Sequence, residues 1–217
     1  MNVLYLHGFA SGPDSTKAHF FQQHFNDLGI AMLVPDLIPK EGDFTRMLTS
    51  RLVKDLMTII ENCDFQDLVV MGSSFGGLLA IWLASIAPKR VQKLILLAPA
   101  IRWSREDVTN IFKTDLKVWQ TRGKLPVFHY RFNKEIPLAY SFVEDLILNP
   151  PPDFYQQPIS CPILILHGAH DEVVPLSWSQ EYAQGRINVN LRVLDSDHQL
   201  LNLLDEIWLV IRRFLCI

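Results

Sequence analysis

The sequence predicts an α/β protein built on a mainly parallel sheet of about six strands, with helices on both faces. Short apolar runs alternate along the chain with segments of helical periodicity, which is typical of a parallel sheet covered on both sides. Polar and glycine-rich motifs directly follow several of these runs. One connection, residues 99–160, is far longer than the others, and it predicts a helical lid inserted after the fourth strand.

The expected strands are the six apolar runs at residues 3–6, 30–34, 68–71, 94–97, 163–166 and 191–194. Ser15 is placed to cap a first helix that ends at Gly29. A second helix is expected to begin at Asp43 or Thr45, and a third to follow residue 72. In the long connection, Ser104 and Asp107 have the spacing of a capping box. Two further helices are expected at residues 137–148 and 200–214.

Composition favours a single globular domain spanning residues 1–217. The chain is 49% hydrophobic and 20% charged, so it can bury a large core. Its net charge is -3 and its pI about 6.1. These values favour neither nucleic acid nor an anionic membrane as a partner.

The chain's cysteines and apolar stretches favour a cytoplasmic protein. Cys63, Cys161 and Cys216 have no paired spacing, which favours a reducing compartment over a disulfide framework. The start of the chain does not have the pattern of a signal peptide. Residues 69–87 carry no charge, but their cluster of glycines and serines indicates a buried strand and helix rather than a membrane span.

Residues 72–76 read Gly-Ser-Ser-Phe-Gly and place Ser74 at the centre of a Gly-x-Ser-x-Gly motif. An apolar run ends at Gly72, and a helical pattern begins within a few residues. This is the context of a nucleophile elbow, in which a sharp turn exposes the serine and Gly72 and Gly76 leave room for neighbouring backbone. Ser74 is therefore the predicted nucleophile. The alternative is an ordinary Gly/Ser-rich turn.

A serine nucleophile needs a histidine base and a carboxylate that orients the base. His198 directly follows the last expected strand, and Asp171 follows the strand before it. Both should therefore lie at the same end of the sheet as Ser74. The order Ser74, Asp171, His198 is that of one large class of hydrolases. Asp197 and Asp145 remain rival carboxylates.

The cluster of His167, His170 and Asp171 also permits a metal-site interpretation. Its spacing fits no common zinc site well. We therefore expect no metal and no cofactor.

Four motifs in this order resemble those of the α/β-hydrolase superfamily, over nearly the whole chain. They are residues 6–9 (oxyanion loop), 72–76 (elbow), 167–175 (acid loop) and 197–198 (base loop). The compact start and small size are most similar to the small bacterial YqiA/YcfP-type esterases. The resemblance implies an α/β-hydrolase fold without the usual first two strands. It also implies an oxyanion hole formed by the backbone N–H groups of Phe9 and Phe75. The base loop departs from the common Gly-His form, because Asp197 precedes His198.

The expected activity is that of a serine hydrolase acting on a small-molecule carboxylic ester or thioester. A non-catalytic binding protein and an acyltransferase or lyase on the same fold are the alternatives, since fold does not fix function. Residues 99–160 are rich in aromatic side chains. We expect some of them, with Trp103, His129 and Tyr130 as candidates, to line a substrate pocket.

Overall fold

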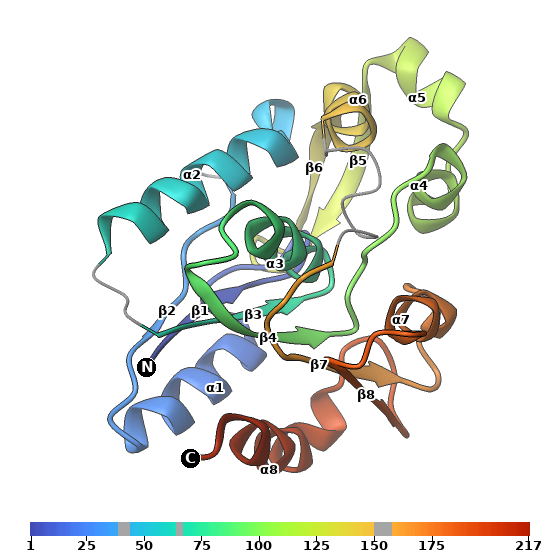
Figure 1. The fold of residues 1–217 in the computed structure, drawn as a ribbon. Helices are drawn as coiled ribbons and strands as arrows, with labels where there is room; N and C mark the ends of the chain where they lie inside the picture. The colour runs from blue at the N-terminus through green and yellow to red at the C-terminus, as the bar shows by residue number, and fades with distance from the viewer. Residues whose placement is uncertain (39–43, 64–66, 150–157) are drawn as a thin grey trace.

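The structure is a computed structural model, and it describes residues 1–38, 44–63, 67–149 and 158–217 (Figure 1). Its main sheet contains β1 (Asn2–Leu6), β2 (Met32–Leu33), β3 (Leu68–Ser73), β4 (Val91–Leu97), β7 (Ile163–Gly168) and β8 (Val189–Leu194). The strand order is β2-β1-β3-β4-β7-β8, and every neighbouring pair is parallel. The predicted six-stranded parallel sheet is confirmed.

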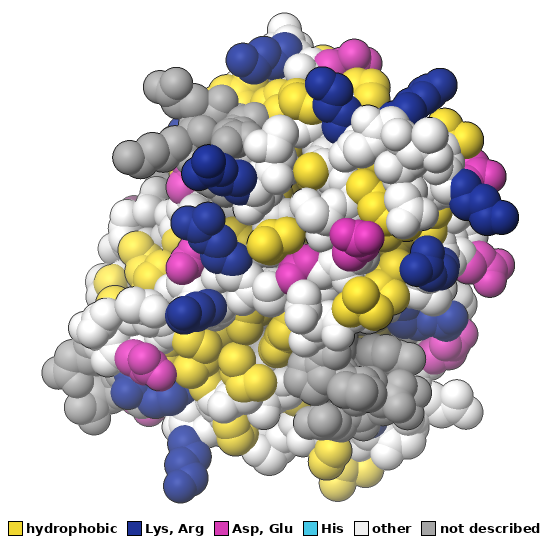
Figure 2. All heavy atoms as spheres, turned by 90° about the horizontal axis from the view of Figure 1, so that it is seen from above, with side chains coloured by type: hydrophobic (Ala, Val, Ile, Leu, Met, Phe, Trp, Pro, Cys, Tyr) yellow, Lys and Arg dark blue, Asp and Glu magenta, His cyan; other side chains and the backbone are white. Residues whose placement is uncertain are grey.

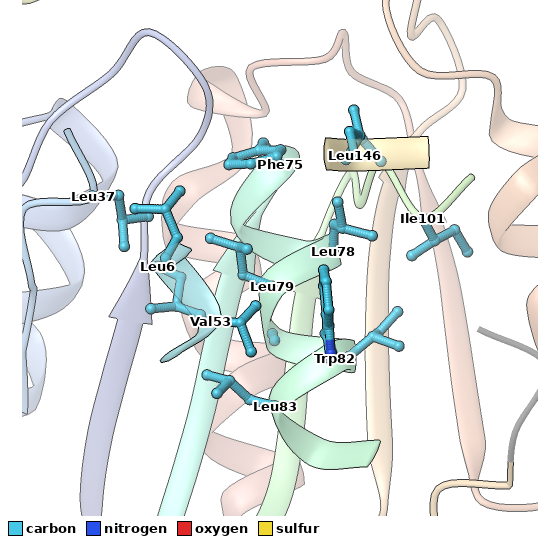
Figure 3. Close-up of a cluster of buried hydrophobic side chains, with 14 of the residues drawn as sticks. Leu6, Leu37, Val53, Phe75, Leu78, Leu79, Trp82, Leu83, Ile101 and Leu146 are labelled. Carbon is cyan, nitrogen blue, oxygen red and sulfur yellow. The ribbon is translucent and has the colours of Figure 1, made fainter. Parts of the chain in front are cut away.

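Helices cover both faces of this sheet. In Figure 1, α1 (Thr16–Asp27) and α8 (Leu204–Leu215) lie below it, and α2 (Thr49–Asn62) and α3 (Phe75–Ile86) lie above it. Alternate residues of β1 enter two separate cores: Tyr5 packs in the cluster of α1 and α8, and Leu6 in that of α2 and α3. Helix α7 (Leu176–Ala183) contributes to the second cluster. Figure 3 shows part of this second cluster around α3.

The segment between β4 and β7 differs from the helical insertion that we expected. It contains α4 (Arg105–Phe112), α5 (Leu116–Arg122) and α6 (Ser141–Leu148), but also the antiparallel strands β5 (Lys124–His129) and β6 (Lys134–Ala139). The expected helix at 137–148 is therefore wrong at its start, because Pro137 lies in β6 opposite Pro126 of β5. Each strand of a two-stranded ribbon has a free edge, where a residue without an N–H is tolerated.

Several helix ends follow their sequence signals. The Ser15 side chain accepts a hydrogen bond from the Ala18 N–H, and Ser104 and Asp107 form both bonds of a capping box. Helix α2 instead begins at Thr49, after the short 3-10 helix η2 (Phe44–Arg46). Our expected start at Thr45 is therefore wrong, and the alternative start, Asp43, lies outside the described residues. A second 3-10 helix, η3 (Leu201–Leu203), precedes α8.

Two further observations bear on the chain's environment. Among the residues that the structure describes, no helix is both long and apolar enough to cross a membrane. The three cysteines are free, and Cys216 is exposed.

Candidate active site

Ser74 lies between the end of β3 and the first residue of α3, where the backbone makes a strained turn. Its φ is 53° and its ψ is -116°, a conformation that costs a residue with a Cβ on the order of 1–3 kcal/mol. The turn is held by its neighbours, because the Ser74 carbonyl accepts from the N–H groups of Gly77 and Ala100. A Cβ on Gly76 would lie 2.0 Å from the Leu6 carbonyl oxygen. Glycine at this position therefore lets the end of β1 lie directly against the elbow.

His198 connects Ser74 to Asp171. The distance from its Nε2 to the Ser74 Oγ is 3.0 Å, and the distance from its Nδ1 to the Asp171 Oδ2 is 2.7 Å. A carboxylate only accepts hydrogen bonds, so Nδ1 carries the hydrogen and Nε2 is left to accept from the serine hydroxyl. The His198 side chain is 20% exposed, whereas that of Asp171 is fully buried. The structure thus brings these three predicted residues into one hydrogen-bonded chain.

Four hydrogen bonds surround the Asp171 carboxylate. Its Oδ1 accepts from the N–H groups of Val173 (2.9 Å) and Val174 (2.8 Å), and its Oδ2 lies 3.1 Å from the Nε2 of His167 as well as beside His198. Burial raises the pKa of Asp171, but the hydrogen bonds from His167 and His198 outweigh it and hold this pKa well below its usual range. Asp171 is therefore a buried carboxylate that stays ionised.

A close approach of two loops places His198 beside Asp171. A Cβ on Gly168, at the end of β7, would lie 2.4 Å from the carbonyl oxygens of both Ser196 and Asp197. The Ser196 carbonyl also accepts from the His170 N–H. Because residue 168 has no side chain, the loop that carries His198 can rest directly on the end of β7.

The rival carboxylates have other partners. The Asp197 Oδ1 accepts from the N–H groups of Gln199 and Leu200 within its own loop. The Asp145 carboxylate accepts from the Ser50 N–H. His170 pairs with Asp195 at the surface, at 2.8 Å, whereas His167 is fully buried. No group of three or more metal-binding side chains occurs in the part of the chain that the structure describes.

Phe9 and Phe75 carry the backbone N–H groups that were expected to form an oxyanion hole. Within the described ranges, neither N–H has a hydrogen-bond acceptor. Phe75 is the first residue of α3, and its ring lies 6.1 Å from that of Phe9. The Phe9 ring also contacts Phe112 of α4 and Phe142 of α6, each at 5.6 Å between centroids. The loop at Phe9 is therefore packed directly against the segment between β4 and β7.

The residues suggested for a substrate pocket lie in different environments. Trp103 is half-buried, and its ring lies 6.2 Å from that of Phe75. Tyr130 is 72% exposed and contacts Phe128. His129 is fully buried against Phe44, and its ring nitrogens have no partner among the described side chains and backbone. Trp103 alone of the three therefore contacts the elbow, and the pocket roles remain predictions.

The surface over the segment between β4 and β7 is mixed in charge and polarity. Figure 2 shows basic and acidic side chains interspersed with apolar ones on the face seen from above. A surface depression of about 730 Å³, lined by residues of α4, the start of α5 and the loop between them, contains none of the predicted site residues. It is therefore separate from the chain of hydrogen bonds at Ser74.

Sequence reasoning missed Lys17, a half-buried residue in the first turn of α1. Burial lowers the pKa of Lys17 to about 8, although the attraction of Asp197 and Asp171 offsets part of that effect. Lys17 therefore acts electrostatically on both aspartates. No local motif marks it, because α1 and the loops after β7 and β8 meet only in the folded chain.

His7 belongs to the expected oxyanion loop, residues 6–9, and anchors the part of it that carries Phe9. Its Nε2 accepts from the Leu37 N–H at 3.1 Å, and its Nδ1 donates to the Gly8 carbonyl at 3.0 Å. Burial lowers the pKa of His7, and the bond to Gly8 offsets this only in part. His7 thus ties the end of β1 to the chain that follows β2.

We expect His7→Ala to lower the free energy of unfolding by about 1–3 kcal/mol, because the Leu37 N–H loses its acceptor. His19→Ala is the matched control, since His19 is exposed on α1 and should change stability by less than about 0.5 kcal/mol. Urea denaturation of both variants measures the difference. Equal unfolding free energies would show that His7 does not anchor this loop.

The family comparison matches almost the entire chain. The model described as "Uncharacterised protein family (UPF0227)" matches residues 2–216. A curated relative, the mitochondrial palmitoyl-protein thioesterase ABHD10 of Mus musculus, is 25% identical over 212 residues. The match covers 91% of this chain and 69% of the relative.

Two solved structures share the fold at low sequence identity. Est1E from Butyrivibrio proteoclasticus, solved with ferulic acid bound, has a TM-score of 0.84 and 20% identity, covering 99% of this chain and 88% of that chain. The monoacylglycerol lipase of Paleococcus ferrophilus has a TM-score of 0.78 and 16% identity, covering 99% and 93%. Together with the family match, these likenesses show that the chain belongs to the uncharacterised protein family UPF0227 and has the fold of the α/β-hydrolase superfamily.

Proposed function

We propose that the protein is a serine hydrolase that cleaves a carboxylic ester or thioester. The observation that carries the proposal is the continuous chain of hydrogen bonds from the Ser74 hydroxyl through His198 to the buried Asp171. Such a chain activates a serine, which is otherwise a poor nucleophile, and places the base where it can return the proton. The reaction needs no cofactor.

In the proposed reaction, the Ser74 Oγ attacks the substrate carbonyl carbon while His198 Nε2 takes the hydroxyl proton. The N–H groups of Phe9 and Phe75 donate to the oxyanion that forms, and one such donor is typically worth about 3–4 kcal/mol. His198 then protonates the departing alcohol or thiol, which leaves an acyl group on Ser74. A water molecule, deprotonated by His198, attacks this acyl-enzyme, and the bond to Ser74 breaks as His198 returns the proton to the Oγ and the free acid leaves. Asp171 keeps the imidazole oriented throughout.

The names of similar proteins support an ester or thioester substrate. They include a palmitoyl-protein thioesterase, a protein solved with ferulic acid bound, and a monoacylglycerol lipase. A panel of acyl esters and acyl thioesters, each from acetyl to palmitoyl, tests the proposal with the purified protein. Turnover of one of the two series is expected. No turnover of either would contradict the proposal.

We also propose that residues 1–217 form one domain in which residues 99–160 act as a lid over Ser74. The contacts of Phe112, Phe142 and Trp103 with the rings of Phe9 and Phe75 support this arrangement. They join side chains of the long segment to the rings of the two residues proposed for the oxyanion hole. The lid would then form part of the wall around the acyl or leaving group.

If Trp103 forms part of this wall, Trp103→Ala should change which acyl length is preferred without abolishing turnover. One methylene in an apolar pocket is worth about 1–3 kcal/mol, so we expect changes of about tenfold in relative kcat/KM between acetyl and octanoyl esters. Tyr130→Ala is the comparison variant, because its largely exposed ring should matter less. A length profile unchanged by Trp103→Ala, in a folded variant, would exclude Trp103 from the pocket wall.

A further inference from the structure

A second histidine binds the same carboxylate oxygen as the proposed catalytic base. The Asp171 Oδ2 lies 2.7 Å from Nδ1 of His198 and 3.1 Å from Nε2 of His167. The side chains of His167 and Asp171 are both fully buried, so water does not compete for this contact. A single oxygen of Asp171 therefore contacts two imidazole rings.

The neighbours of His167 determine where its hydrogen lies. Its Nε2 is within 3.1 Å of both the Asp171 carboxylate and the Val174 carbonyl, and both of these groups are acceptors. Nε2 must therefore carry a hydrogen. Its Nδ1 lies 2.7 Å from the hydroxyl of Ser179, which is buried in α7 and can donate to that nitrogen. The hydrogen-bonded chain thus extends from Ser74 back to Ser179.

We propose that His167 is a positioning residue that fixes the Asp171 carboxylate and moderates the basicity of His198, an inference that rests on the proposed function. A carboxylate oxygen that already accepts one hydrogen bond offers less negative charge to a second donor. Asp171 therefore stabilises protonated His198 less strongly than an unshared carboxylate would. Loss of the His167 contact should therefore make protonation of His198 easier.

Other charged groups also face the site, and they stay unchanged when His167 is substituted. Lys17 of α1 acts on Asp171 and Asp197, and Asp197 precedes His198 on its own loop. His170 and Asp195 form an exposed pair beyond them. A change caused by substituting His167 can therefore be separated from the effects of these groups.

Asparagine and glutamine at position 167 test the two imidazole nitrogens one at a time, because each amide nitrogen can replace only one of them. In His167→Gln, the amide nitrogen can occupy the place of Nε2 and still donate to Asp171. In His167→Asn, the shorter side chain can reach only the place of Nδ1, near Ser179, so Asp171 loses this donor. We expect His167→Asn to move the acid limb of the kcat/KM profile to higher pH by about 0.5–1 pH unit. His167→Gln should leave the limb near its wild-type position.

Ser179→Ala provides a second test if His167→Asn fails to fold. Removing the hydroxyl weakens the polarisation of His167, so the acid limb should move in the same direction by a smaller amount. A lower kcat with an unmoved acid limb in all three variants would overturn the proposal, because it would show that His167 only packs in the core. An equal shift in His167→Asn and His167→Gln would also overturn it.

A titration of the His198 imidazole by NMR distinguishes this proposal from the proposed function. The measurement needs no substrate and follows the ring protons of His198 in wild-type protein and in both His167 variants. If the protein hydrolyses no ester, the proposed function fails, yet a titration shifted upward only in His167→Asn still supports the link through Asp171. If hydrolysis occurs and the titration is unmoved in all variants, the role of His167 is excluded and the proposed function stands.

Discussion

Ser74→Ala is expected to lower kcat by about a millionfold, because removing a serine nucleophile that acts with a histidine base disables the whole unit. Without the Oγ, His198 has no hydroxyl to deprotonate, and no acyl-enzyme can form. Steady-state kinetics on the best substrate of the ester and thioester panel measures the loss. Binding and the backbone donors at Phe9 and Phe75 should leave a small residual rate.

The neighbouring serine is the matched control for this change. Ser73 is the last residue of β3, and its side chain hydrogen-bonds to the buried Tyr5 rather than to His198. Ser73→Ala should keep kcat within about tenfold of the wild type, because it costs at most the net worth of one hydrogen bond. If Ser73→Ala caused the large loss and Ser74→Ala did not, the nucleophile would have been assigned to the wrong residue.

Asp171→Asn should lower kcat by about ten-thousandfold while the protein stays folded. An amide in place of the carboxylate cannot hold His198 with its hydrogen on Nδ1, so the wrong tautomer would face Ser74. Kinetics together with a thermal unfolding midpoint separate this effect from misfolding.

Asp197→Asn is the comparison for the acid, since Asp197 adjoins His198 in sequence. Its Oδ1 accepts only from N–H groups of its own loop among the described contacts, and the oxygen of an asparagine can do the same. We therefore expect a change in kcat of less than about tenfold, in keeping with the loss of an exposed charge. A crippled Asp197→Asn beside an active Asp171→Asn would reverse the assignment of the carboxylate.

The sheet could be predicted because its strands are buried on both faces. Residues 68–71 and 163–166 are continuous apolar runs, and the structure buries every one of their side chains. Such runs stand out from the periodic helices between them. The spatial order of the strands does not follow from these runs, since β1 lies between β2 and β3 and the pairing joins distant residues.

The segment between β4 and β7 was harder to predict because its local signals conflict. Pro126 and Pro137 are unusual in strands, yet they face each other in the hairpin of β5 and β6. The pairing is decided by the inner faces, where Ile136 and Leu138 are buried in the core. Tertiary packing therefore overrides the local preference at this place.

Part of the candidate site could likewise be predicted from local sequence motifs, whereas the rest depends on contacts between residues far apart in the chain. The positions of Ser74, Asp171 and His198 follow from motifs at the ends of three strands, and each motif is continuous in sequence. The roles of His7 and Lys17 depend on contacts with residues far away in the chain. The sequence marks His167 as the first residue of the acid loop and as a hypothetical metal ligand. Its contact with the oxygen that also binds His198 requires the folded loops.

Covalent labelling with a fluorophosphonate tests the central claim most directly, because the reagent captures an activated serine without any knowledge of the substrate. Intact-mass analysis of the wild-type protein should show a single adduct, and peptide mapping should place it on Ser74. The adduct should be absent in Ser74→Ala and present in Ser73→Ala. An adduct on another serine, or the absence of labelling in a protein that hydrolyses esters, would contradict the account.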